Sequence, residues 1–167
     1  MAGRLTVAIN SLNALIRDLR SFLTGLEPKG IGGAELKGAL KSLLLAAGPD
    51  EEARFSIQIE PSAAHKLSRV QATEIFNIAR EAISNCLRHA RAANASVTLH
   101  AHARGIRLVV TDDGAGFDRA KTKDASMGFR NMRNRASALG AALDIVSAPG
   151  QGTTVNLDIP NSAHDNH

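Results

Sequence analysis

IRLVVTDDGAGF, residues 106–117, is the stretch of sequence that decides how this chain folds. Apolar side chains recur at every second position from Ile106 to Val110, which predicts a strand with one buried face. Continuing by twos places Asp112 on the buried face, whereas Asp113 points away from it. The two glycines that follow indicate a turn or a close approach of the backbone to another group. The stretch therefore predicts a strand that carries a carboxylate to the edge of the core.

Four further segments alternate apolar and polar residues in the same way. The predicted sheet then has about five strands, at residues 54–60, 97–102, 106–111, 142–147 and 153–159. Helical spacing of apolar residues predicts helices at 34–47, 68–92 and 129–139. Because antiparallel strands dominate and each helix has one apolar side, we expect an α/β two-layer sandwich. Its mixed sheet would be covered by helices on one face.

The first 28 residues form a separate part of the chain. Residues 4–26 carry a broad, heptad-like apolar stripe, which is typical of a helix in a bundle. A single helix cannot bury such a stripe, so we expect a partner helix. Residues 29–160 would then be one globular domain, and the polar residues 161–167 a disordered tail.

The composition narrows the classes of function. Aromatic residues make up only 3% of the chain, without Trp or Tyr, which argues against a stacking platform for nucleic acid. The net charge of +4 suits nucleic acid, membrane lipids or a small polyanion such as a nucleotide, and does not choose among them. The single cysteine, Cys86, allows no disulfide within the chain, and the longest apolar run is too short to span a bilayer. We therefore expect a cytoplasmic domain without membrane contact of its own, whether or not a longer parent protein is anchored.

Three polar residues, Glu81, Asn85 and His89, recur at intervals of four on the predicted helix 68–92. Steps of four keep side chains on one helix face, here beside the apolar stripe. A carboxylate, an amide oxygen and an imidazole in a row suit a magnesium-bound phosphate, because Mg²⁺ prefers hard oxygen ligands. An ordinary solvated helix face has the same spacing, so this feature alone leaves both interpretations open.

The end of the strand at Asp112 is a second candidate site. A carboxylate turned towards a core is costly unless a polar group pairs with it, and an adenine amino group is one such partner. Thr153, counted back by twos from Ile159, faces the same side as Asp112. Gly128 precedes the predicted helix 129–139, where free backbone N–H groups attract an anion. Each of these features, taken alone, also occurs in plain turns and hairpins.

Taken together, the order and spacing of these segments resemble the GHKL ATPase superfamily, and within it the sensor histidine kinases of the nitrate-sensor and DesK type. Residues 80–90, REAISNCLRHA, resemble the N box of that family, and residues 112–117 resemble its first glycine box. Residues 127–136, MGFRNMRNRA, and 148–153, APGQGT, resemble the later glycine boxes. The resemblance covers residues 34–160 and implies the Bergerat, or GHKL, ATP-binding fold.

The resemblance also implies a Mg-ATP site with a role for each matching residue. Asn85 would coordinate magnesium, and Glu81 would orient a metal-bound water or act as a base. His89 would lie near the phosphates. Asp112 would accept a hydrogen bond from the adenine amino group, with Thr153 beside it. The glycines that would frame the nucleotide are Gly114, Gly116, Gly128 and Gly152.

The N-terminal stripe resembles another part of these kinases. Residues 1–28 look like the second helix of their dimerisation and phosphotransfer hairpin, which implies a homodimer through this helix in the whole kinase. The first helix would carry the phospho-accepting histidine, but no such motif precedes Leu5, and His164-Asp165 lies in the polar tail. The resemblance thus implies transfer of the ATP γ-phosphoryl group to a histidine outside this chain, for relay to the receiver domain of a response regulator.

Two other functions remain open at this point. An anti-sigma-factor-type serine kinase belongs to the same superfamily, although the helix at 4–26 and the MRNRA segment at 132–136 argue against it. A regulatory or dimerisation module that no longer turns over ATP would use the stripe at 4–26 as its interaction surface, although the intact boxes argue against this.

Overall fold

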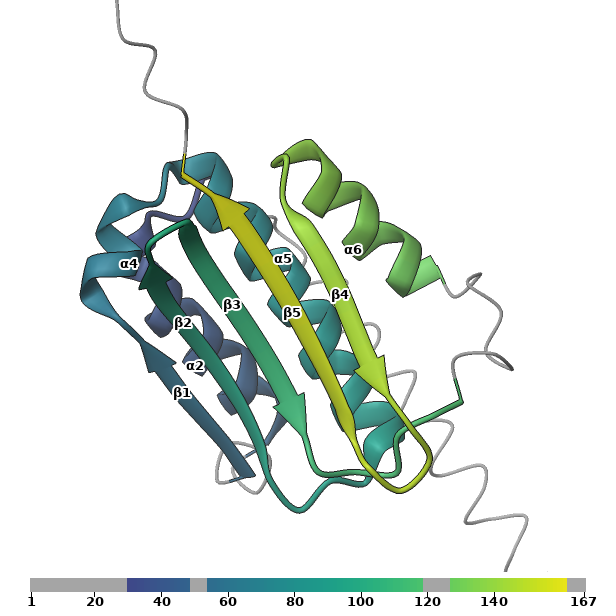
Figure 1. Cartoon of the computed structure of the whole chain (residues 1–167). Coiled ribbons are helices and arrows are strands. Elements are labelled where there is room, and N and C mark those ends of the chain that lie inside the picture. The colour runs from purple at the N-terminus through teal and green to yellow at the C-terminus, as the bar shows by residue number, and fades with distance from the viewer. Residues whose placement is uncertain (1–29, 49–53, 119–126, 162–167) are drawn as a thin grey trace, which may run out of the picture. The chain divides into compact units, whose positions relative to one another are not determined.

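The computed structural model describes residues 30–48, 54–118 and 127–161 (Figure 1). The predicted bundle helix at 1–28 and the predicted tail, apart from Asn161, fall outside the described residues, and the expectations for them stay predictions. In the described part of the chain, no helix is both long enough and apolar enough to cross a membrane.

Among the described residues, five strands form one mixed sheet in the spatial order β1-β2-β3-β5-β4 (Figure 1). β1 runs parallel to β2, and the other neighbouring pairs are antiparallel. The predicted five-stranded mixed sheet is thereby confirmed. The strands are β1 (Phe55–Ile59), β2 (Ala95–His102), β3 (Gly105–Asp112), β4 (Ala142–Ser147) and β5 (Thr153–Pro160).

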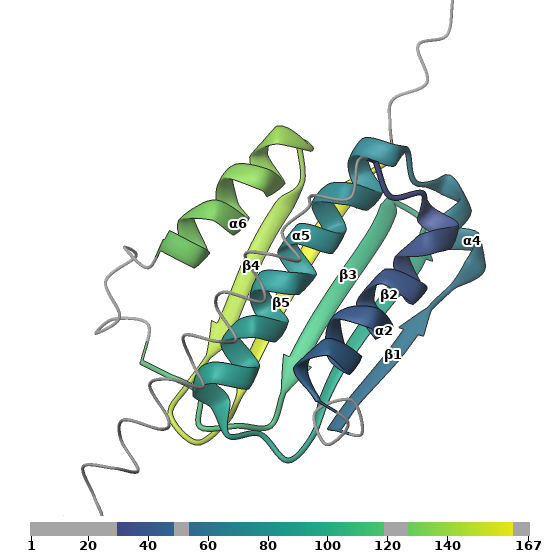
Figure 2. The ribbon, with the colours of Figure 1, turned by 180° about the vertical axis from the view of Figure 1, so that it is seen from behind.

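The main helices lie on one face of this sheet, as expected for a two-layer sandwich. Seen from behind, α2, α5 and α6 lie side by side over the sheet and run roughly along its strands (Figure 2). The described helices are α2 (Leu36–Ala47), α4 (Pro61–Lys66), α5 (Arg69–Asn85) and α6 (Met127–Ala138), with short turns at η1 (Gly33–Glu35) and η2 (Cys86–Ala90).

The core forms where α5 packs on the centre of the sheet, because both surfaces are apolar. Leu99, Leu108 and Leu157 stand side by side on β2, β3 and β5, and each is at most 1% exposed. Ile75 and Ile78 of α5 are fully buried. Burying one such side chain contributes roughly 1.5–3 kcal/mol. Packing against the sheet, more than helix propensity, therefore fixes α5 in place.

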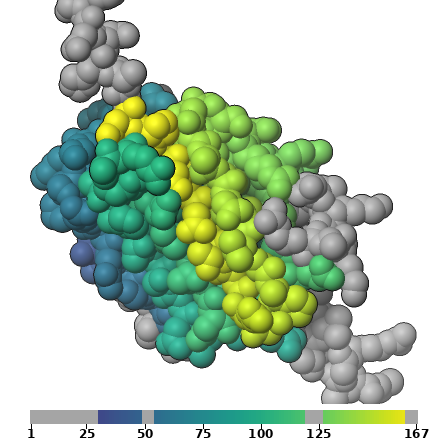
Figure 3. Space-filling model, viewed as in Figure 1, coloured from purple at the N-terminus to yellow at the C-terminus, as the bar shows by residue number. Residues whose placement is uncertain are grey.

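No described helix covers the other face of the sheet, and the strands themselves form that side of the molecule (Figure 3). Its side chains are largely polar. Arg107 on β3 makes a two-point ion pair with Asp158 on β5, at 2.6 and 2.9 Å. The hydroxyls of Thr111 and Thr154 lie 2.8 Å apart on the same strands. This strict alternation fixes which residues of β3 and β5 face the helices.

The predicted helix 68–92 changes character near its end. Its α-helical part stops at Asn85, and η2 is a wider, π-helical turn that ends at Arg91 in the left-handed conformation, with φ 50°. The carbonyl of Ala90 accepts a hydrogen bond at 2.7 Å from the N–H of Ala115, so η2 docks on the loop after β3. The continuous helix was wrong here because apolar spacing carries no signal for that distant contact.

Two helix starts also differ from the predictions. No helix was predicted directly after the strand 54–60, but Pro61 is the first residue of α4, where its fixed φ and missing N–H are harmless. α6 starts at Met127 rather than Phe129. Gly128 therefore lies inside the first turn of α6 and not before it, which corrects the predicted position.

Candidate functional site

A cavity of about 290 Å³ lies among α5, η2, β3 and β5. The end of α5, the end of β3 and the start of β5 meet at the lower end of the domain in Figure 1. The volume is close to the lower limit for small-molecule sites, roughly 300 Å³. The residues that line the cavity are Ala82, Asn85, Cys86, His89, Ala90, Val110, Asp112, Gly116, Phe117, Phe129, Thr153 and Val155.

The structure brings five of the predicted residues together around this cavity. Asn85 and His89 come from α5 and η2, while Asp112, Gly116 and Thr153 come from the strands and the loop after β3. His89 reaches the cavity although η2 departs from α-helical spacing. The predicted residues that do not line the cavity are Glu81, Gly114, Gly128 and Gly152.

Asp112 and Thr153 are paired directly across β3 and β5 and face the same side, as the alternation predicted. The Oδ1 atom of Asp112 accepts a hydrogen bond from the N–H of Gly114 at 2.9 Å. Its other carboxylate oxygen accepts none from the residues that the structure describes. Asp112 thus keeps one acceptor for a ligand, which is what an exocyclic amino group requires.

Two glycines allow the loops beside the cavity to close on the strands. Gly116 and Gly152 have φ of 58° and 69°, in the left-handed region that other residues rarely adopt. A Cβ atom on Gly116 would lie 2.0 Å from the carbonyl oxygen of Ala148. A Cβ atom on Gly152 would lie 2.0 Å from the carbonyl oxygen of Asp112. No side chain fits at either place without moving backbone.

The sequence of this chain matches the model of a known protein family. The family described as histidine kinase-, DNA gyrase B-, and HSP90-like ATPase matches residues 70–163. The chain belongs to this ATPase family. The matched region contains α5 except its first residue, the loops that carry Gly116 and Gly152, and β5, and membership of this ATPase family supports ATP as the nucleotide.

Relatives of this ATPase domain include sensor kinases. Sensor histidine kinase LiaS of Bacillus subtilis is 31% identical over 143 residues, which cover 86% of this chain and 39% of LiaS. Sensor protein VraS of Staphylococcus aureus is 29% identical over 150 residues, which cover 90% of this chain and 42% of VraS. The chain thus spans about two fifths of the length of these relatives. Membership of the nitrate-sensor or DesK subgroup stays a prediction.

Solved structures agree on the fold of the ATPase domain. The histidine kinase domain from the Erythrobacter litoralis EL346 blue-light activated histidine kinase matches with a TM-score of 0.62 at 25% identity, over 77% of this chain and 64% of that one. The ATP binding domain of PrrB from Mycobacterium tuberculosis gives 0.55 at 16% identity, over 77% and 95%. The predicted GHKL sandwich is therefore confirmed.

Asp113 points away from the cavity of the ATPase domain and fastens the segment after η2. Its Oδ1 atom accepts hydrogen bonds from the backbone N–H groups of Ala93 and Asn94, at 2.8 and 2.9 Å. Its Oδ2 atom accepts one from the Asn94 side-chain amide at 2.8 Å. These hydrogen bonds, first of all those from Asn94, lower the pKa of the Asp113 carboxyl below its ordinary value.

Replacing Asp113 with asparagine should destabilise the domain at neutral pH more than in acid. Because the folded-state pKa is lowered, the carboxylate adds stability above its unfolded-state pKa of about 4, and this stability is lost as pH falls through the folded-state pKa. Urea unfolding of both proteins near pH 7 and near pH 3 measures the difference. A difference of equal size at both pH values would show that the charge of Asp113 contributes nothing.

Glu81 stands behind the cavity, at the contact between α5 and α6. A Cβ atom on Gly128 would lie 2.1 Å from the Oε1 atom of Glu81, so the carboxylate lies against the first turn of α6. Free N–H groups in a first helical turn favour a nearby negative charge. Farther along the same two helices, Arg135 pairs with Glu74 at 2.8 Å. The register of α6 on α5 is thus held at two points, and Gly128 contacts Glu81 instead of lining the cavity.

Two aromatic residues of the cavity were missed by the sequence reasoning. Phe117 and Phe129 stack with ring centroids 5.4 Å apart and an interplanar angle of 29°. Their apolar rings offer a surface for a flat ligand. Each follows a glycine that the sequence analysis did single out, Gly116 and Gly128, so both positions offered a usable signal. Cys86, the single cysteine, is buried and also lines the cavity.

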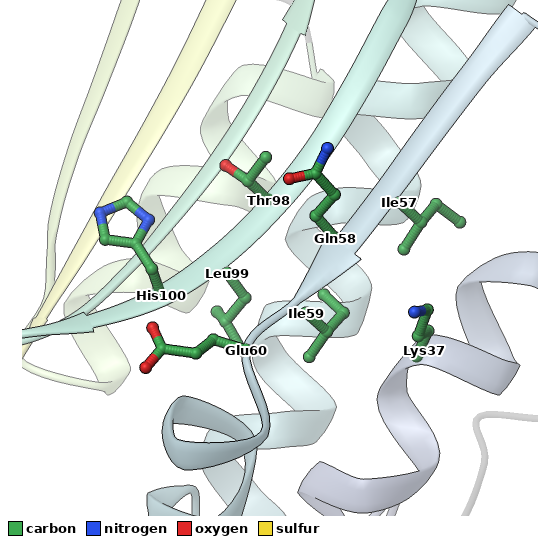
Figure 4. Close-up of a pocket in the computed structure, with 8 residues that line it drawn as sticks. All are labelled: Lys37, Ile57, Gln58, Ile59, Glu60, Thr98, Leu99 and His100. Atoms are coloured by element: carbon green, nitrogen blue, oxygen red, sulfur yellow. The ribbon is translucent and has the colours of Figure 1, made fainter.

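A second, more open hollow of about 520 Å³ lies along the edge strand β1 (Figure 4). Its carboxylate, Glu60, is already engaged, because it accepts hydrogen bonds from the N–H of Ala101 at 2.9 Å and from the hydroxyl of Ser62. None of its lining residues belongs to the segments that resemble the N box and the glycine boxes, whereas the smaller cavity is lined by residues of these segments. The lining residues are Lys37, Ile57, Gln58, Ile59, Glu60, Thr98, Leu99 and His100.

Proposed function

We propose that residues 29–160 bind Mg-ATP and act as the catalytic domain of a sensor histidine kinase. The γ-phosphoryl group of ATP would pass to a histidine of the parent kinase, and from there to the receiver domain of a response regulator. Residues 1–28 would dimerise the parent. The observation that carries the proposal is one cavity that joins Asp112 and Thr153 to Asn85 and His89.

The residues of this cavity suit the two ends of a nucleotide. The remaining oxygen of Asp112 can accept a hydrogen bond from an adenine amino group, beside the stacked rings of Phe117 and Phe129. Asn85 and His89 offer an amide oxygen and an imidazole to the phosphates. Phosphoryl transfer depends mainly on positioning and on neutralising charge, which such a set of residues supplies.

Magnesium fits these residues. Mg²⁺ usually keeps several waters and takes only one or two protein ligands together with phosphate oxygens, so the side-chain oxygen of Asn85 is a sufficient protein ligand. Glu81 lies one helical turn before Asn85 and would orient a water or accept a proton. When bound, the metal would neutralise phosphate charge.

The named relatives favour this function over the alternatives. LiaS is described as a sensor histidine kinase, and the Erythrobacter litoralis structure as a histidine kinase domain. These names support a histidine kinase over an anti-sigma-factor-type serine kinase or a non-catalytic module.

Calorimetric titration with ADP, with and without magnesium, tests nucleotide binding. Binding of about one ADP per chain that weakens when magnesium is removed would support the proposal, and absence of saturable binding would contradict it. Incubation of the parent kinase with labelled ATP tests the transfer. Acid-labile label on a histidine is the expected result, whereas label on a serine of a partner protein would favour the serine kinase.

Replacing Asn85 with alanine should remove most of the magnesium dependence of ADP binding. The variant loses the amide oxygen that holds the metal, so the affinity measured with magnesium should fall roughly tenfold, towards the metal-free value. Ser84→Ala is the matched control, because Ser84 precedes Asn85 on α5 but does not line the cavity. Full magnesium dependence in Asn85→Ala would show that Asn85 is not the metal ligand.

A further inference from the structure

Ser147, the last residue of β4, stands directly behind the cavity. The pairing of β4 with β5 and of β5 with β3 sets Ser147, Thr153 and Asp112 in a row across three neighbouring strands. Directly paired residues point to the same face of a sheet. Asp112 and Thr153 line the cavity, and Ser147 lies on the far side of Thr153.

The hydroxyl of Ser147 has three hydrogen-bond partners. They are the N–H of Phe117 at 3.0 Å, the carbonyl oxygen of Gly152 at 2.8 Å and the hydroxyl of Thr153 at 3.0 Å. A serine hydroxyl has one hydrogen and two lone pairs, so each partner takes one of them. Because an N–H only donates and a carbonyl only accepts, the Ser147 hydrogen goes to Gly152. The Thr153 hydroxyl must then donate its own hydrogen to Ser147.

This direction leaves Thr153 as an acceptor towards the cavity. Its hydroxyl hydrogen is used on Ser147, and the hydroxyl has no other hydrogen-bond partner among the residues that the structure describes. The paired residue Asp112 presents a second acceptor. Two adjacent acceptors suit a group with two hydrogens. The 6-amino group of adenine has them, and the 6-carbonyl group of hypoxanthine has none.

The same hydroxyl fastens the loop after β3 to the loop before β5. Through Ser147, the backbone of Phe117 is joined to that of Gly152. A backbone hydrogen bond from the N–H of Gly150 to the carbonyl of Ala115, at 2.7 Å, joins the two loops a second time. Loss of the Ser147 hydroxyl would therefore loosen the loop as well as release Thr153.

We propose that Ser147 is a positioning residue for base recognition. It sets the direction of the Thr153 hydroxyl and thereby favours an amino group over a carbonyl group at position 6 of a purine. Ser147 does not line the cavity and acts through Thr153. The inference rests on the proposed nucleotide binding and adds to it the residue that makes the binding selective.

The test compares ADP with inosine diphosphate, which carries a carbonyl group in place of the amino group. Both are titrated calorimetrically against the wild type, Ser147→Ala and Ser147→Thr. In Ser147→Ala, the released Thr153 hydroxyl can donate to the carbonyl. ADP affinity should fall about tenfold, while inosine diphosphate affinity stays within about twofold. Ser147→Thr keeps the hydroxyl and should keep the preference for ADP.

Two further variants keep the test decisive. Thr154→Val removes the hydroxyl pair with Thr111 on the outer face of the same strands and should leave both affinities unchanged. Thr153→Val removes one of the two acceptors and should reduce the preference for ADP, while Asp112 remains; this variant tests the acceptor even if Ser147→Ala does not fold. Amide hydrogen exchange at Phe117 reports the loop contact without nucleotide and should quicken in Ser147→Ala.

The outcomes separate this inference from the proposed function. An equal loss of ADP and inosine diphosphate affinity in Ser147→Ala, or no loss of ADP affinity, would overturn the role of Ser147. A wild type that binds neither nucleotide would overturn the proposed function, and base recognition by Ser147 with it. Unchanged hydrogen exchange at Phe117 would show that Ser147 does not fasten the loop.

Discussion

Replacing Asp112 with asparagine is expected to weaken ADP binding by about 100-fold, or roughly 3 kcal/mol, with little change in stability. The side-chain oxygen of asparagine still accepts the hydrogen bond from Gly114, which spans 2.9 Å in the wild type. The other position becomes an NH₂ group, which cannot accept a hydrogen bond from an adenine amino group. A donor would then face another donor, so the hydrogen bond to the base is lost and neither group is paired.

Calorimetric titration with ADP at constant magnesium measures this loss, and urea unfolding shows that the variant is folded. Asp113→Asn is the matched control, because it makes the same chemical change on the side of β3 that faces away from the cavity. Its ADP affinity near pH 7 should match the wild type. Wild-type affinity in Asp112→Asn would mean that the base does not bind at this carboxylate.

Replacing Gly152 with alanine should destabilise the whole domain, by about 3 kcal/mol or more. Its φ of 69° is unfavourable for alanine, and the added Cβ would lie 2.0 Å from the carbonyl oxygen of Asp112. That oxygen belongs to the backbone of β3, so it cannot move without disturbing the pairing of Asp112 with Thr153. The site should be lost together with the stability.

Gly150→Ala separates the backbone strain from the close approach of the added Cβ to the carbonyl oxygen of Asp112. Gly150 has a similar φ of 75°, but nothing lies within 4 Å of the place where its Cβ would be. This variant should therefore show only the backbone strain of a left-handed alanine, about 1–2 kcal/mol. Urea unfolding compares both variants with the wild type. If Gly152→Ala is no less stable than Gly150→Ala, the contact with Asp112 is not what requires glycine.

Local patterns in the sequence carry the information for the sheet and for half of the site. Alternation along β3 and β5 was sufficient to place Asp112 and Thr153 on one face, because side chains in a strand alternate strictly. Helical spacing placed Asn85 beside the apolar stripe for the same kind of reason. The roles of these residues came from the resemblance of the motifs, and they remain proposals.

The features that the sequence did not reveal depend on contacts between distant backbone groups. The π-helical turn η2 packs its Ala90 carbonyl against the N–H of Ala115. The hydroxyl of Ser147 binds the backbone of Phe117 and of Gly152. Backbone N–H and C=O groups are the same for every residue type. The pattern of side chains in the sequence therefore does not indicate which backbone groups will be hydrogen-bond partners. The contact of Gly128 with Glu81 was missed for a related reason, since it depends on how α6 lies on α5.

Because β5 lies between β3 and β4, the acceptor pair of Asp112 and Thr153 cannot form until β5 has been synthesised and has inserted between these strands. Asp112 emerges with β3, but its neighbour Thr153 belongs to β5, the last strand of the described chain. Until β5 inserts, β4 pairs with no other strand of the sheet, and α5 carries Asn85 beside an incomplete cavity. A nucleotide bound at the proposed site would therefore stabilise the domain only after β5 is in place.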